Sequence, residues 1–153
     1  MSCSGGIFGP KLTVLEIDKN ANFSKTEKVE FYFSEKADPT HGSYIPKGLR
    51  YHQIAKVRIK GKMPSQTGNV NDPMFPFVAK RSYTQSILNS YYDMAVALED
   101  KAKELGADTV IIQNIKYVRE QRVDAVSYSL DKKVLIGPWF DIPIWDALLA
   151  RRL

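Results

Sequence analysis

The sequence predicts a single α+β domain, with an antiparallel or mixed sheet of about five to six strands, one long helix packed on a face and a short C-terminal helix. Short runs of β-branched and aromatic residues recur along the chain, and one long segment repeats apolar residues every three or four positions. At 153 residues and 44% hydrophobic composition, the chain can build one hydrophobic core. We expect a flexible tether over 1–10, one domain over 11–138 and an aromatic tail or helix over 139–153.

Two strands are expected near the N-terminus, over 12–17 and 28–33. In the second strand Val29, Phe31 and Phe33 share one face because side chains alternate along a strand. That face is predicted to belong to the core.

A third strand is expected over 54–61, after a loop at 37–48 that is rich in Pro and Gly. Residues of this strand alternate between apolar and basic, which is typical of a half-buried strand. The expected inward residues are Ala55, Val57 and Ile59, and the outward residues are Lys56, Arg58 and Lys60.

The long helix is predicted over 82–105, after an irregular connection at 62–80. Ser82 and Gln85 form a capping-box pattern at its start, and Gly106 stands where a left-handed C-terminal cap belongs. Residues with the helical spacing are Ile87, Tyr91, Met94, Leu98, Ala102 and Leu105.

Three further strands are expected over 109–117, 123–130 and 132–136, with a turn near Asp131 between the last two. The tail is then predicted to form a short helix that starts near Pro143. A helix there would group Trp145, Leu148 and Leu149 on one side.

The sequence KAKELGADTVIIQNIKY over 101–117 ends the helix and begins the next strand. It resembles small bacterial domains related to YbjQ and to the envelope lipoprotein RcsF, and secreted bacterial proteins often labelled as excinuclease ATPase subunits. The resemblance covers about half of the chain and implies an antiparallel sheet crossed by one long helix. The cysteines of those relatives are missing where residues 126–134 stand here, so neither disulfide-dependent sensing nor metal binding is transferred.

Composition narrows the classes of function. One cysteine excludes an internal disulfide framework, and His41 and His52 leave too few soft ligands for a zinc site. No run of about 18 apolar residues is present. The sequence also shows no pattern of a nucleophile beside a base or of paired carboxylates, so we expect no enzyme, no cofactor and no metal.

The first residues suggest a lipid anchor. Cys3 is followed by Ser4, Gly5 and Gly6, which is similar to the start of a processed bacterial lipoprotein, with lipid on Cys3. The resemblance implies outer-membrane retention with Ser4 beside the lipidated residue, on the periplasmic side. The alternative is a cytoplasmic protein with an incidental N-terminal cysteine.

Positive charge is concentrated in one segment, where residues 39–81 hold eight basic residues and one acidic residue in a chain of net charge +5. The candidate basic face consists of Lys47, Arg50, Lys56, Arg58, Lys60 and Lys62. Such a face could contact nucleic-acid phosphates or anionic lipid. Alternatively, it is a solvated strand face that prevents aggregation through an edge.

The tail supplies the second candidate surface. Its candidate docking residues are Trp139, Phe140, Trp145, Leu148 and Leu149. They could bind a partner, or they could cover the open end of the core. We therefore expect a non-catalytic, lipoprotein-like domain of the bacterial cell envelope that binds other envelope proteins or its own copies. The alternative is a cytosolic nucleic-acid-binding domain that uses the basic face over 47–62.

Overall fold

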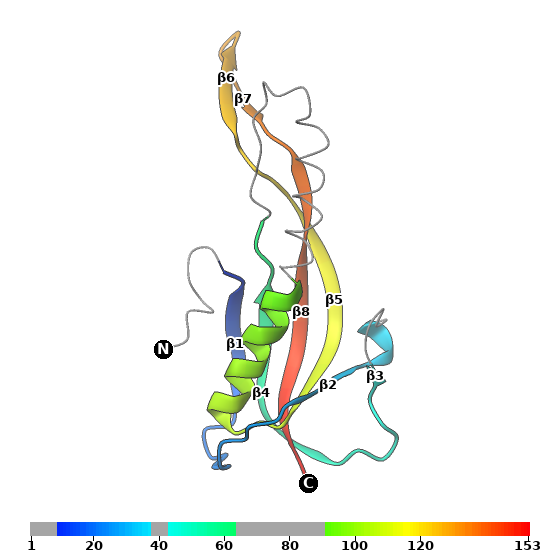
Figure 1. Ribbon diagram of the computed structural model, residues 1–153. Coiled ribbons are helices and arrows are strands. Elements are labelled where there is room, and N and C mark those ends of the chain that lie inside the picture. Colours follow the sequence, from blue (N-terminus) through cyan, green and yellow to red (C-terminus); the bar gives the residue numbers. More distant parts are fainter. Residues whose placement is uncertain (1–8, 38–42, 64–90) are drawn as a thin grey trace.

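A computed structural model describes residues 9–37, 43–63 and 91–153, which form an α+β structure dominated by strands (Figure 1). The main sheet has six strands in the order β1-β4-β8-β5-β2-β3. Its strands are β1 (Lys11–Ile17), β2 (Glu30–Phe33), β3 (Ser43–Tyr44), β4 (Tyr51–Lys60), β5 (Thr109–Gln121) and β8 (Trp139–Arg152). The sheet is mixed, because β2 runs parallel to β5 while β8 runs antiparallel to β4 and β5.

The segment predicted as a loop over 37–48 is not wholly irregular, because it includes the strand β3 and begins at the last residue of a 3-10 helix. A 3-10 helix, η1 (Glu35–Ala37), follows β2, and the two-residue strand β3 pairs with β2 at the edge of the sheet. The predicted helix start at Ser82 and most of the 62–80 connection lie outside the described residues.

The helix occupies 91–105 in the described part of the chain and lies across one face of the sheet (Figure 1). Met94, Leu98 and Ala102 are buried, as the helical spacing predicts. They belong to one core cluster with the inward residues of β4 and with Val110, Ile112, Trp145, Ala147 and Leu149. The alternation predicted for β4 is confirmed, since Ala55, Val57 and Ile59 are buried in this cluster. Phe31 and Phe33 of β2 pack against it, as predicted.

Gly106 ends the helix in the left-handed conformation, with φ of +78°. The amide of Ala107 donates to the carbonyl oxygen of Ala102 at 2.8 Å, which is the bond of a Schellman cap. A Cβ atom on Gly106 would lie 2.7 Å from the carbonyl oxygen of Phe23. Glycine is therefore required by the backbone conformation and by the close approach of the 23–24 segment.

The predicted C-terminal helix is wrong, because residues 139–152 form β8, a strand between β4 and β5. The tail therefore belongs to the domain predicted over 11–138. Proline disfavours the middle of a sheet because it lacks an amide proton. Pro143, however, lies just beyond the end of β4, where its carbonyl accepts a bond from Gly61 at 2.8 Å. The missing amide proton of Pro143 therefore falls outside the β4–β8 ladder, which ends at the Lys60–Ile144 pair.

A second, two-stranded sheet joins β6 (Ala125–Ser129) to β7 (Lys132–Ile136) as an antiparallel hairpin. The turn predicted near Asp131 is confirmed. The hairpin continues the β5–β8 ribbon and extends beyond the described body of the domain (Figure 1). Residues 122–138 are called the arm below. Across the residues that the structure describes, no helix is long and apolar enough to cross a membrane.

Candidate functional site

The predicted lipidation residue, Cys3, lies outside the described residues, as does His41. The lipid anchor therefore stays a prediction from the sequence.

The basic face divides into paired and unpaired side chains. Arg58 donates to Asp146 of β8 at 2.7 Å, Lys60 pairs with Glu120 of β5, and Lys62 lies 3.1 Å from Asp93 of the helix. Within the described ranges, Lys47, Arg50 and Lys56 have no ion-pair partner. Three of the six predicted cations are thus neutralised by carboxylates. This leaves fewer free positive charges for a continuous phosphate-binding surface.

The predicted docking residues of the tail are mostly buried. Phe140, Trp145, Leu148 and Leu149 are each at most 9% exposed, because β8 is central in the sheet. Trp139, at the start of β8, is the exception and is 56% exposed. It lies at the base of the arm, with the guanidinium of Arg119 5.8 Å from the ring centroid.

The arm is the main exposed apolar feature of the described structure. Every residue of β6 and β7 is exposed, including both members of each cross-strand pair. One face carries the Val126–Leu135 pair and Tyr128, and the opposite face carries Val134 and Ile136. A hairpin is stable when at least one of its faces packs against other elements, so two exposed apolar faces are unusual.

The tip of the arm is strained. Leu130 and Asp131 have φ of 49° and 62°, which is the pattern of a type I′ turn. Such turns favour Asn-Gly, because ordinary side chains disfavour positive φ. Leu130 is nevertheless 94% exposed at this position. Folding of the hairpin alone does not explain a leucine that is both exposed and held at positive φ.

The base of the arm is held by polar contacts. The side chain of Gln121 donates to the carbonyl oxygens of Leu135 and Gly137 at 3.0 and 3.1 Å. Arg122 pairs with Asp124 at 2.9 Å. These contacts couple the direction of the arm to the end of β5.

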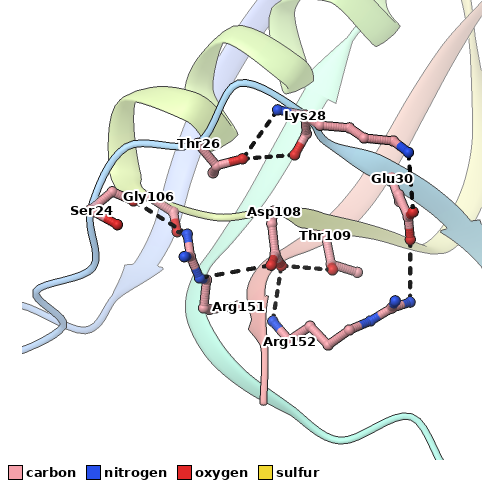
Figure 2. Close-up of polar contacts among 9 residues, drawn as sticks. All are labelled: Ser24, Thr26, Lys28, Glu30, Gly106, Asp108, Thr109, Arg151 and Arg152. Atoms are coloured by element: carbon pink, nitrogen blue, oxygen red, sulfur yellow. Dashed lines mark hydrogen bonds and ion pairs between the residues drawn. The ribbon is translucent and has the colours of Figure 1, made fainter.

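A polar network (Figure 2) lies at the end of the sheet opposite the arm, where the chain ends (Figure 1). Asp108, directly after the helix cap, accepts from the amide of Arg152 at 2.9 Å and lies 3.7 Å from the Arg151 guanidinium. Arg151 also donates to the carbonyl oxygens of Ser24 and Gly106, both at 3.2 Å. The network therefore fastens β8 to the helix end and to the segment before β2.

Arg152 extends this network to β2. Its guanidinium lies 3.2 Å from Glu30 and donates to the Tyr32 hydroxyl at 2.9 Å (Figure 2 shows the contact with Glu30). Tyr32 in turn donates to Glu30 at 2.6 Å, and this bond lowers the pKa of Glu30 and raises the pKa of Tyr32. The donors and acceptors of this network bind one another. We therefore interpret the network as structural, joining β8 to β2.

The ring of His52 lies on the surface. Its Nε2 atom is 2.8 Å from Asp18, and the ring contacts Phe23 with centroids 5.7 Å apart. The hydrogen bond from His52 is the main cause of the lowered pKa of Asp18. Over 9–37, 43–63 and 91–153, no three His, Cys, Asp or Glu side chains gather into a cation site.

A comparison of the chain with protein families, curated proteins and solved structures finds no match. The resemblance to YbjQ-like and RcsF-like domains therefore stays a prediction from the motif over 101–117. The fold class agrees with it only at the level of a sheet with one helix on a face.

Sequence reasoning identified both strands of the arm without identifying the arm as a site. The available signal was the apolar residue on each face of β6 and β7 together with a Leu-Asp turn. A strand with two apolar faces is typical of a sheet interior, and only the tertiary structure places this hairpin outside the body.

Proposed function

We propose that this protein is a non-catalytic assembly protein that associates with its own copies through the arm. The observation that supports the proposal is the exposure of apolar side chains on both faces and at the tip. They are Val126, Tyr128, Leu130, Val134, Leu135 and Ile136. Exposed apolar patches are typical of protein interaction sites, and here they occupy two opposite faces and the tip of the arm.

The area of the patch is consistent with an interface. The exposed parts of these six side chains amount to on the order of 600 Å², as estimated from typical side-chain areas. Trp139 at the base of the arm adds to this surface. A standard interface buries about 800 Å² per partner. Because these side chains divide between two opposite faces and the tip, a contact through one face and the tip would supply only part of that area.

A second copy is the partner that this surface suits best. In a two-fold dimer a surface patch contacts the same patch of the second copy. An apolar patch can be complementary to itself, because it needs no pairing of opposite charges. The charged residues at the tip are one acid, Asp131, and two bases, Lys132 and Lys133, which give a net charge of +1, so repulsion between two arms is small. Both outer edges of the hairpin are also unpaired within the described residues, which permits strand pairing between arms.

The test is the molar mass of the purified protein in a dilution series, measured by light scattering and sedimentation. We expect a reversible dimer. Leu130→Asp should weaken it by roughly thirtyfold, the loss expected for a central apolar contact of about 2 kcal/mol.

Tyr128→Ser and Tyr92→Ser form a matched pair for this experiment. Tyr128 is 77% exposed on the arm, and Tyr92 is 71% exposed on the helix. Only Tyr128→Ser should weaken the dimer. A wild-type protein that is monomeric at all concentrations, or equal effects of the two variants, contradicts the proposal. Unlimited polymers would instead implicate an open contact, such as one with the exposed edge of β1.

We propose the bacterial envelope as the location on the sequence alone, with Cys3 carrying the lipid. The mass of the mature N-terminus from the native host tests this. An acylated Cys3 in the membrane fraction supports it, and an unmodified soluble chain contradicts it. The nucleic-acid alternative has less support, because Arg58, Lys60 and Lys62 are already paired with carboxylates.

A further inference from the structure

A cleft of about 780 Å³ opens beside the irregular pairing of β5 with β8, where the register shifts between Ile112 and Asn114. Lys56 of β4 and Asp146 of β8 line it from the face of the sheet opposite the helix. The 3-10 helix η1 and β3 complete its wall. None of the lining residues lies on the arm, and the volume of the cleft lies within the range of small-molecule sites, about 300–1,000 Å³.

The cleft is rich in hydrogen-bond donors. Lys36 and Lys56 both line it, and neither has an ion-pair partner in the part of the chain that the structure describes. The side-chain amides of Gln113 and Asn114 and the hydroxyl of Tyr44 add further donors. None of these three side chains makes a hydrogen bond to another described residue. Five side chains thus offer donors to one volume.

The acceptors in the cleft are fewer and partly occupied. Asp146 binds Arg58 through both carboxylate oxygens, at 2.7 and 3.4 Å. The guanidinium neutralises this carboxylate, so Asp146 repels an anion only weakly. Glu35 is the other acid in the lining. Its negative charge is outnumbered by the two positive charges of Lys36 and Lys56. Lys116, on the same face as Asp146, adds another positive charge nearby.

The remaining wall is apolar and partly aromatic, formed by Phe33, Tyr44 and Ile45. Flat apolar groups pack well against such a wall. We propose that this cleft binds a small organic oxyanion, a carboxylate or phosphate monoester carried on a flat ring. The lysines and amides bind the oxyanion, and the apolar wall contacts the ring.

The test is a titration followed by the amide NMR signals of the full chain, with phenyl phosphate and benzoate as ring-bearing oxyanions. Two control compounds each carry one part of the proposed ligand: inorganic phosphate has the oxyanion without the ring, and benzyl alcohol has the ring without the oxyanion. We expect a ring-bearing oxyanion to shift the signals of Ser34 and Asn114 with a Kd of about 1 mM or below, as small fragments allow. Inorganic phosphate and benzyl alcohol should bind at least tenfold more weakly. Whether phenyl phosphate or benzoate binds more tightly decides which oxyanion the cleft prefers.

Three charge-removing variants complete the test. Lys56→Gln and Lys36→Gln should each weaken binding at least fivefold, whereas Lys47→Gln, outside the cleft, should leave it unchanged. No shift with either ring-bearing oxyanion overturns the proposal. It is also overturned if inorganic phosphate binds equally well, since that indicates an adventitious ion only, or if Lys47→Gln weakens binding as much as Lys56→Gln. The outcome is independent of the dimer, because none of these residues lies on the arm.

Discussion

Replacing the two turn residues at the tip of the arm by Asn-Gly should separate the stability of the hairpin from its contribution to dimer formation. Leu130 and Asp131 both have positive φ, which costs roughly 1–2 kcal/mol for an ordinary residue. Asn and Gly tolerate this turn, so the double variant Leu130→Asn, Asp131→Gly should stabilise the hairpin by about 1 kcal/mol. The same change removes an apolar side chain that is 94% exposed and available to a partner.

The double variant should therefore stabilise the hairpin and weaken the dimer, and two measurements separate these effects. Amide hydrogen exchange in β6 and β7 of the monomer should slow by about fivefold, which corresponds to 1 kcal/mol. Dimer formation should weaken at least tenfold, since burying a leucine contributes about 1.5–3 kcal/mol. A variant that exchanges more slowly and still dimerises as tightly as the wild type would refute the assignment of Leu130 to the interface. Unchanged exchange would refute the strain argument.

Two further predictions concern stability. Gly106→Ala should destabilise the fold by about 2–3 kcal/mol in urea titration, because Ala is strained at this φ and its Cβ would meet Phe23. Gly48→Ala is the matched control: it shares the φ of +78° but meets no atom within 4 Å, so it should cost only about 1 kcal/mol. Asp146→Asn should cost about 1–2 kcal/mol at neutral pH, since the hydrogen bond from Arg58 holds the Asp146 pKa below its ordinary value of 3.8. A carboxyl with a lowered pKa stabilises the fold above about pH 4 and loses that contribution as pH falls through its folded pKa, so the difference from wild type should shrink in acid. A difference that stays constant down to acid unfolding would argue against the Arg58–Asp146 pair as its source.

Local patterns in the sequence predicted the elements that depend on short-range physics. The alternation in β4 separates Val57 from Lys56 because a strand with one buried face requires it. Gly106 was predicted as the helix cap because few other residues adopt positive φ there. The turn at Asp131 followed from two adjacent β-rich runs.

The tail shows where local patterns fail. The residues from Trp139 to Leu149 fit a short helix as well as a strand, and Pro143 favoured a helix start. Long-range pairing with β4 and β5 overrides that preference, since it buries Leu149 completely. The predicted docking residues of the tail are consequently core residues, apart from Trp139.

The sequence by itself determined the α+β class, the alternating faces of the strands, the helix end at Gly106 and the excess of positive charge, because each depends on neighbours along the chain. Only the tertiary structure decided that the tail is the central strand β8 and that β6 and β7 form a separate hairpin, the arm. It also decided that Arg58 and Lys60 are paired with carboxylates and that Lys36 and Lys56 line one cleft. Each of these depends on segments far apart in the sequence, whose pairing is set by the burial of the whole core.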